Sequence, residues 1–265
     1  MRNEIAASEL IACTIRAILA SGINLVIDGS FHIEIGPLVA KASEAIHRPE
    51  DLLAIESKRG ATTLLDFGCG TGAYRRLCES HGFQWTGLNY AEGMSDGARA
   101  AAKRLDDIAF YDGRCIPAED NCFDVVFSMQ VFEHLTDIAA TFSELARVMR
   151  PGGAIVGSVS QLEQMHDYST FNFTPYGLKT ASEAAGLRLE KVYPRFDAFT
   201  FLFRRLLIVT SGTNENSLSM ELRHDNMVMQ EFERYGKRIG MDEVRTSLMK
   251  LMFSSHFAFV VRKEK

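Results

Sequence analysis

The sequence predicts an α/β fold built on a mainly parallel β-sheet. Short apolar runs alternate with helical patterns between residues 62 and 193. Such alternation is typical of strands joined by crossover helices, and the continuous apolar run at 123–129 (FDVVFSM) is typical of a strand buried on both faces. The length of 265 residues and the 46% hydrophobic composition allow one large globular domain that carries an insertion.

The N-terminal 60 residues are expected to form a helical segment. Ile11, Ile15 and Leu19 recur at helical spacing, so the spacing predicts an amphipathic helix over 4–20. Pro49 precedes two acidic residues, a pattern that favours the first turn of a short helix.

The core pattern begins near residue 62 and gives seven expected strands. They are 62–67, 83–88, 108–111, 123–129, 154–159, 187–193 and 256–261. Helices are expected at 73–80, 91–105, 137–149 and 174–186. The third of these helices is expected to stop at Pro151-Gly152-Gly153, because proline and glycine end helices. Thr174 and Pro175 suit the start of the fourth, as cap and first helical residue.

The segment between the sixth and seventh strands is too long to be a hairpin loop. Its helical periodicity predicts an inserted helical cap over 194–255, with the core domain formed by 61–193 and 256–265. Six of the 11 methionines lie in this cap. Two interpretations stay open for these methionines, namely a lid over an apolar acceptor and the inward faces of packed helices. Docking of 201–207 on a membrane surface is not favoured.

Composition excludes several classes of protein. A net charge of −5 without a basic block is not typical of a nucleic-acid-binding protein. Five cysteines without zinc-type spacing predict neither disulfides nor a metal site. No apolar run reaches the length of a membrane span or a signal peptide, so the expected location is the cytoplasm.

The strongest chemical signal is the glycine loop LLDFGCGTG at 64–72, which lies between the first strand and the next helix. Glycines allow the backbone to approach a ligand closely, and such a loop at the end of a parallel strand binds nucleotide-like cofactors. Gly68, Gly70 and Ala73 also satisfy the weak GxGxxG/A pattern of dinucleotide-binding proteins. Asp66 argues against that alternative, because its charge would repel a pyrophosphate and attract an ammonium group.

The chain resembles the class I S-adenosylmethionine-dependent methyltransferases that methylate small molecules. Matching segments follow in order, namely the glycine loop, GLNY at 87–90, DG at 112–113, FDVV at 123–126, EHL at 133–135 and RVMRPGG at 147–153. The resemblance implies a Rossmann-like seven-stranded sheet of order 3-2-1-4-5-7-6 with strand 7 antiparallel, and S-adenosyl-L-methionine as the cofactor.

Site residues follow from the same resemblance. It implies that the loop residues hold the methionine part of the cofactor, that Asn89 stands where the family has an acid for the ribose, and that residues further on contact the adenine. The resulting cofactor-binding residues are Asp66, Gly68, Gly70, Gly72, Asn89, Tyr90, Met94, Asp112, Gly113 and Gln130.

The sequence says less about the residues that take part in the reaction than about those that bind the cofactor. A hydroxyl acceptor needs a base, and Glu133, His134 and His166 follow strands at the edge where the cofactor is expected. His134 and His166 are the candidates, although His134 also suits a structural role. The expected reaction is methyl transfer to a small molecule, such as a sugar or secondary-metabolite hydroxyl. An NAD-dependent oxidoreductase and a non-catalytic S-adenosylmethionine-binding protein remain alternatives.

Overall fold

The computed structural model describes residues 2–20, 34–46, 48–90, 92, 94–104, 107–163, 168–212 and 227–265. Its contacts divide the chain into two compact units. We call 48–192 with 258–265 the sheet unit, and 1–47 with 193–257 the helical unit. The sequence-based boundaries at 60, 194 and 255 stay predictions; the contacts group the N-terminal helix with the inserted segment.

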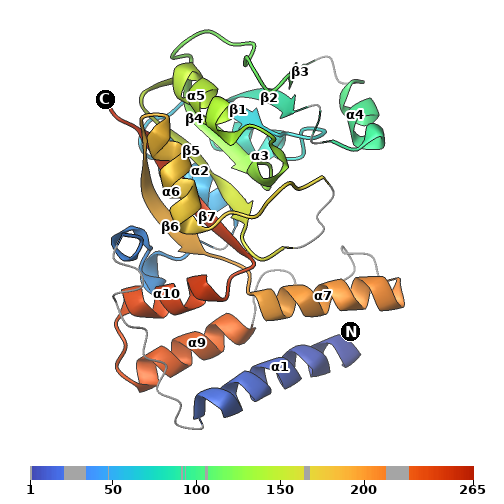
Figure 1. Cartoon of the computed structure of the whole chain (residues 1–265), viewed down its shortest axis with the longest axis vertical. Helices are drawn as coiled ribbons and strands as arrows, with labels where there is room; N and C mark the ends of the chain where they lie inside the picture. The colour runs from blue at the N-terminus through green and yellow to red at the C-terminus, as the bar shows by residue number, and fades with distance from the viewer. Residues whose placement is uncertain are drawn as a thin grey trace. The chain divides into compact units, whose positions relative to one another are not determined.

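The sheet has seven strands in the order β3-β2-β1-β4-β5-β7-β6, as predicted, and β7 is antiparallel (Figure 1). The strands are β1 (Thr63–Phe67), β2 (Gln84–Tyr90), β3 (Ile108–Tyr111), β4 (Phe123–Met129), β5 (Met149–Ser160), β6 (Leu187–Pro194) and β7 (His256–Lys263). Strands β1 to β5 pair in parallel. The carboxyl ends of β1, β2 and β4 therefore meet at one edge of the sheet.

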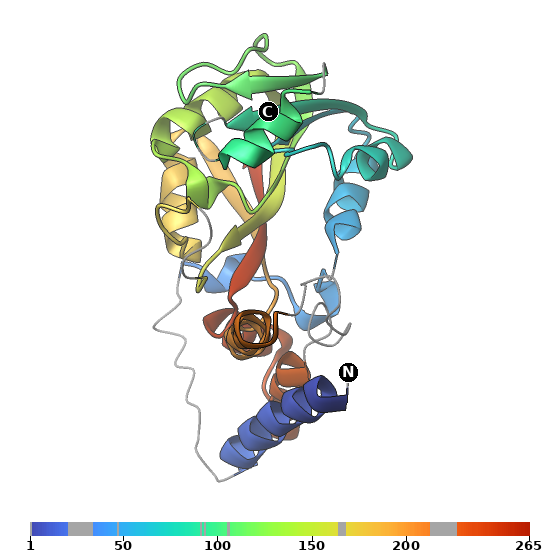
Figure 2. The ribbon, with the colours of Figure 1, turned by 90° about the vertical axis from the view of Figure 1, so that its right-hand side faces the viewer.

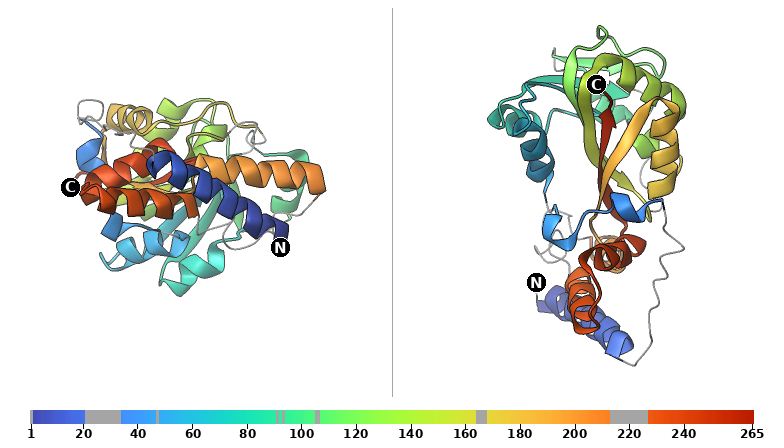
Figure 3. Two further views of the ribbon diagram at one scale, coloured as in Figure 1. Left: turned by 90° about the horizontal axis from the view of Figure 1, so that it is seen from below. Right: turned by 90° about the vertical axis from the view of Figure 1, so that its left-hand side faces the viewer.

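Helices cover both faces of this sheet, which explains the continuous apolar strands. They are α2 (Pro49–Ser57), α3 (Arg75–Ser80), α4 (Asp96–Ala102), α5 (Ile138–Val148) and α6 (Pro175–Ala184). Figures 2 and 3 show α5 and α6 on one face, with α2 and α3 on the other. The glycine loop thus runs from the end of β1 to the start of α3.

Most elements differ from their predicted bounds by one or a few residues, and β5 and α4 differ most. Strand β5 begins at Met149, although the sequence indicates only a helix stop as far as Gly153. A Cβ added at Gly153 would lie 2.9 Å from the carbonyl oxygens of Asp124 and Arg150, so the glycine permits close packing of backbones there. Helix α4 begins only at Asp96, because the Ser95 side chain caps it by accepting a hydrogen bond from the Ala98 amide.

The helical unit contains α1 (Arg2–Ala20), α7 (Ala198–Ser211), α9 (Met227–Arg238) and α10 (Glu243–Met252). Helix α1 packs along α9 (Figures 1 and 3). Helix α10 contributes to the same core, which consists of Ile15, Leu19, Val228, Met229, Phe232, Tyr235 and Met249. Two of the inserted methionines, Met229 and Met249, therefore lie in a helix core, which favours the packing interpretation for them.

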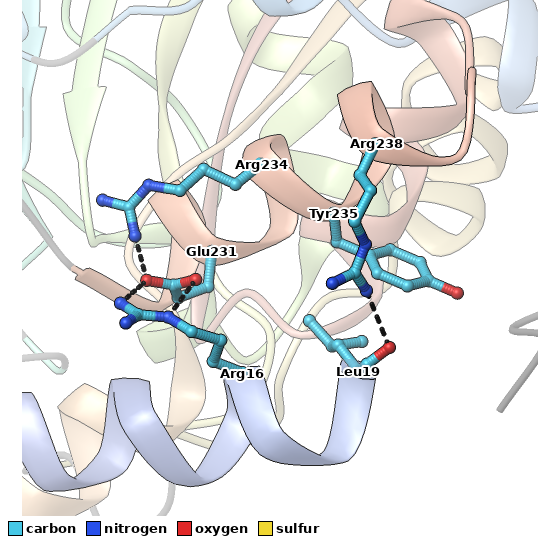
Figure 4. A pocket seen from close by; sticks show the side chains of 6 residues that line it. All are labelled: Arg16, Leu19, Glu231, Arg234, Tyr235 and Arg238. Atoms are coloured by element: carbon cyan, nitrogen blue, oxygen red, sulfur yellow. Dashed lines mark hydrogen bonds and ion pairs between the residues drawn. The ribbon is translucent and has the colours of Figure 1, made fainter. Parts of the chain in front are cut away.

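Arginines connect α1 to α9 beside a cavity of about 560 Å³ (Figure 4). The nearly buried carboxylate of Glu231 accepts hydrogen bonds from Arg16 and Arg234. Hydrogen bonding to Arg16 lowers the pKa of Glu231. Arg238 donates to the Leu19 carbonyl oxygen at 2.9 Å, close to the carboxyl end of α1, where a cation also complements the helix dipole.

None of the helices in the described part of the chain is long and apolar enough to cross a membrane. The described residues also contain no cluster of His, Cys, Asp or Glu that suits a metal ion. All five cysteines are free thiols.

Candidate functional site

The glycine loop bends sharply as it leaves β1. Gly68 and Gly70 have φ angles of +81° and +56°, in the left-handed region that favours glycine. A Cβ added at Gly68 would lie 2.2 Å from Val131 Cγ2, so this position also has no space for a side chain. At Gly70 the added Cβ would meet no atom of the described residues within 4 Å. The loop therefore presents the Gly70 backbone to open space.

Asn89 at the end of β2 holds this loop by its backbone. The Gly70 amide donates to Asn89 Oδ1 at 2.7 Å, and Asn89 Nδ2 donates to the Gly70 carbonyl oxygen at 2.8 Å. Asn89 is only 1% exposed. Its two polar atoms are thus both bonded to one residue of the loop, which the sequence did not reveal.

Asp66 lies at the base of the loop and is almost completely buried, with 2% exposure. Burial raises the pKa of Asp66 to about 6, although a hydrogen bond from Trp85 opposes this shift. Trp85 Nε1 donates to Asp66 Oδ2 at 2.9 Å. The Arg75 guanidinium lies 5.0 Å from the centre of the Trp85 ring, in cation–π geometry. Trp85 therefore fixes the orientation of the Asp66 carboxylate.

A cavity of about 280 Å³ opens beside the loop, at the edge where β1, β2 and β4 end. It is lined by Gly68, Gly70, Asn89, Tyr90, Met94, Ser95, Ala98, Gln130, Val131 and His134. The structure thus brings together seven of the predicted site residues. Among the residues that the structure describes, none of the ten that line the cavity is a lysine or an arginine.

Four predicted cofactor residues, Asp66, Gly72, Asp112 and Gly113, are not among the lining residues of this cavity. Gly72 lies against the Trp85 ring, and Gly113 against the Tyr90 ring. Asp112 Oδ1 accepts from the amides of Arg114 at 2.8 Å and Cys115 at 3.0 Å. These bonds lower the pKa of Asp112 and stabilise the turn after β3.

The structure describes two of the three residues considered for catalysis and places them differently. His134 is the last residue of the short helix η5 (Phe132–His134) after β4 and lines the cavity. His166 lies outside the described residues. Glu133 is fully buried, and burial raises its pKa to about 7. Its Oε1 accepts a hydrogen bond from the Ser160 hydroxyl at 2.9 Å, so Glu133 belongs to the interior between β4 and β5.

Gln130 has a φ angle of +57°, which is uncommon for a residue other than glycine. Its side chain bonds to two hydroxyls of β5, those of Ser158 at 3.0 Å and Ser160 at 2.9 Å. Gln130 directly follows the last residue of β4. Its neighbour Val131 packs on Gly68. Backbone strain of this kind is concentrated at functional sites.

The sequence did not indicate Ser95, Ala98 and Val131 as lining residues. Ser95 has a recognisable signal, since it precedes a helical pattern and caps α4. Nothing in the local pattern of Ala98 or Val131 distinguishes them from ordinary packing residues.

The region of the chain that forms the cavity matches a known protein family. Residues 65–157, from the glycine loop to β5, match the sequence family described as the methyltransferase domain. These residues form a class I S-adenosylmethionine-dependent methyltransferase domain. In this domain, the matched residues include the loop, Asn89 and His134, and therefore most of the cavity.

Two curated relatives show how far the similarity to the methyltransferase domain extends. Malonyl-(acyl-carrier protein) O-methyltransferase of Serratia marcescens is 37% identical over 119 residues, which cover 44% of this chain and 46% of that protein. The 2-methyl-6-phytyl-1,4-hydroquinone methyltransferase of Synechocystis sp. is 32% identical over 139 residues, covering 47% and 43%. The chain therefore spans less than half the length of either relative.

A solved structure shares the fold of the methyltransferase domain. The putative sarcosine dimethylglycine methyltransferase from Galdieria sulphuraria superposes with a TM-score of 0.52, at 20% identity over 81% of this chain and 85% of that one. This likeness supports the Rossmann-like sheet that the sequence predicted.

Proposed function

We propose that this chain binds S-adenosylmethionine in the glycine-loop cavity and transfers its methyl group to an oxygen of a small molecule. The observation that carries the proposal is the cavity itself, which joins Gly70, Met94 and His134 within the methyltransferase domain. The two relatives named above support methyl transfer, and their names specify different acceptors. The acceptor of this chain is therefore an open part of the proposal.

The charge of the cavity suits this cofactor. Bound S-adenosylmethionine supplies an activated methyl group on a positively charged sulfonium. The described lining residues include no lysine or arginine that would repel this charge, and they offer a pyrophosphate no lysine or arginine partner. This electrostatic difference favours S-adenosylmethionine over NAD.

Individual residues take distinct roles in this proposal. The Asp66 carboxylate, oriented by Trp85, attracts the ammonium group of the cofactor. Met94 offers an apolar surface to the adenine. His134 accepts the proton of an acceptor hydroxyl while the oxygen takes the methyl group. Gly70 keeps the backbone close to the ligand, and the inserted segment 194–255 is proposed to select the acceptor.

Binding of S-adenosylhomocysteine is expected to weaken in acid because of Asp66. Its pKa of about 6 means that the carboxyl group is ionised at pH 8 and increasingly protonated below pH 6. If the carboxylate binds the ammonium group, affinity falls by about tenfold per pH unit below that pKa and is constant well above it. Calorimetric titrations from pH 5 to pH 8 measure this profile.

The Asp66→Asn variant serves as the control for that profile. It lacks the titrating charge, so its affinity should be low and independent of pH over the same range. If the affinity of the parent is as independent of pH as that of Asp66→Asn, Asp66 does not bind the cofactor.

A turnover assay tests methyl transfer directly. The protein is incubated with methyl-labelled S-adenosylmethionine and a panel of malonyl thioesters, hydroquinones and sugars. We expect S-adenosylhomocysteine to form with one acceptor class. If that acceptor is a hydroquinone or sugar hydroxyl, His134→Gln should lower the rate by about a hundredfold or more while the cofactor still binds. Cofactor binding without labelled product from any acceptor would instead support a non-catalytic binding protein.

A further inference from the structure

The Asn89 side chain pairs with the backbone N–H and C=O of Gly70, offering an acceptor to the first and a donor to the second. Its amide nitrogen reaches the Gly70 carbonyl oxygen at 2.8 Å, while its amide oxygen reaches the Gly70 nitrogen at 2.7 Å. Cys69 Sγ also lies 3.6 Å from Asn89 Oδ1. The Gly70 N–H and C=O belong to the two successive peptide groups on either side of its Cα. Their fixed roles as donor and acceptor determine which end of the amide is oxygen, because the reversed orientation would oppose like groups.

This pairing bears on the conformation of the loop. Gly70 has a φ angle of +56° and no side chain to hold it by packing. The two hydrogen bonds from β2, together with a contact of 3.8 Å from Cys69 Sγ to the Gly70 carbonyl oxygen, are the described contacts that hold its backbone in position. These two bonds also occupy both polar atoms of Asn89, the side chain to which the family resemblance assigns binding of the ribose.

We propose that Asn89 is a positioning residue, which holds the Gly70 peptide in its ligand-ready conformation instead of serving chiefly as the ribose ligand. The effect on cofactor affinity rests on the function proposed above, whereas the effect on the loop does not. The two bonds require both a donor and an acceptor in the side chain of residue 89. An aspartate would keep the acceptor for the Gly70 amide but place a second anionic oxygen against the Gly70 carbonyl oxygen.

Protonation of such an aspartate would restore the donor. A neutral carboxylic acid has the shape of the asparagine amide, with one hydroxyl donor and one carbonyl acceptor. Burial at this position favours that neutral form. Asn89→Asp should therefore resemble the parent in acid and be defective at pH 8, whereas a ribose ligand would benefit from the charge at pH 8.

The first experiment follows the Gly70 amide without any cofactor. Amide hydrogen exchange by NMR should show at least about tenfold less protection of Gly70 in Asn89→Ala than in the parent. Asn121→Ala, which removes the same amide side chain at an exposed position, should leave this protection unchanged. Equal protection of Gly70 in the parent and in Asn89→Ala would overturn the proposal.

The second experiment measures S-adenosylhomocysteine affinity relative to the parent at each pH. We expect Asn89→Ala to bind about tenfold more weakly at pH 5 and at pH 8. Asn89→Asp should bind about a hundredfold more weakly at pH 8 and recover to within a few-fold of the parent at pH 5. Binding by Asn89→Asp at pH 8 that equals or exceeds the parent would contradict the proposal and make residue 89 a ribose ligand.

The two experiments separate two kinds of failure. If the parent binds no S-adenosylhomocysteine, the proposed cofactor function is wrong, and the exchange of the Gly70 amide still decides the role of Asn89. If the parent binds the cofactor but Gly70 protection does not depend on Asn89, the proposed function stands and the positioning role is wrong.

Discussion

Gly70→Val is expected to weaken S-adenosylhomocysteine binding by at least about a hundredfold while the protein stays folded. A β-branched residue disfavours the φ angle of +56°, at a cost of about 1–3 kcal/mol. Because the added Cβ meets no protein atom within 4 Å, the fold tolerates the side chain, but its methyl groups enter the space beside the loop. Strain on the loop and loss of ligand space therefore act together on binding. Calorimetry measures the affinity, and thermal melting measures the fold.

Gly186→Val is the matched control for this variant. Gly186 belongs to the sheet unit, has a φ angle of +73°, and also has no atom within 4 Å of an added Cβ. It is not among the residues that line the cavity. We expect a comparable loss of stability but unchanged affinity. Full affinity in a folded Gly70→Val protein would show that the ligand does not approach this part of the loop.

Glu56→Ala is expected to lower the free energy of unfolding by about 3 kcal/mol or more. Arg262 is buried, and its guanidinium donates two hydrogen bonds of 2.8 Å to Glu56, which is 2% exposed. Arg262 Nε also donates to Glu190 at 2.6 Å. Removing Glu56 leaves a buried cation with one partner fewer, which costs more than the lost contact itself. Urea unfolding of the ligand-free protein measures the change.

Two further variants show whether charge burial causes this loss. Glu190 is also paired with Arg59 at 3.0 Å, and the Arg59 side chain is about half exposed. Arg59→Ala should therefore change stability by less than about 1 kcal/mol. Replacing the buried pair together, as Glu56→Leu with Arg262→Leu, should recover much of the loss. A Glu56→Ala protein as stable as Arg59→Ala would contradict this account of the buried ion pair.

The order of strands and helices could be predicted because periodicity and apolar runs are local properties. Strands β3 and β4 have the predicted bounds, and the glycine loop lies at the predicted junction. The early start of β5 was missed because Pro151-Gly152-Gly153 suits a helix stop and also a strand that packs closely on neighbouring backbone. Local pattern does not separate these two uses of glycine.

Contacts between distant residues could not be predicted in the same way. The Arg16–Glu231 pair joins residues that are 215 positions apart, and neither has a sequence signal that identifies the other. The pairing of α1 with α9 therefore appears only in the structure. The grouping of 1–47 with 193–257 rests on that pairing and on the contacts of 36–38 and 42–44 with α10.

The role of Asn89 illustrates a third kind of difference. Its position at the end of β2 was predictable, and so was its place beside the cavity. Its hydrogen-bond partner depends on how the Gly70 peptide turns toward β2. The residue pattern alone is compatible with a ribose ligand or with a loop anchor, and only the three-dimensional arrangement favours the anchor.

The central claim is that the glycine-loop cavity is an S-adenosylmethionine site. The most direct test is calorimetric titration of the parent protein with S-adenosylhomocysteine and, separately, with NAD at pH 8, each repeated on Gly70→Val. The account predicts saturable binding of one S-adenosylhomocysteine per chain, its loss in Gly70→Val, and no heat of binding with NAD. Binding of NAD by the parent, or failure of the folded parent to bind S-adenosylhomocysteine, would contradict it.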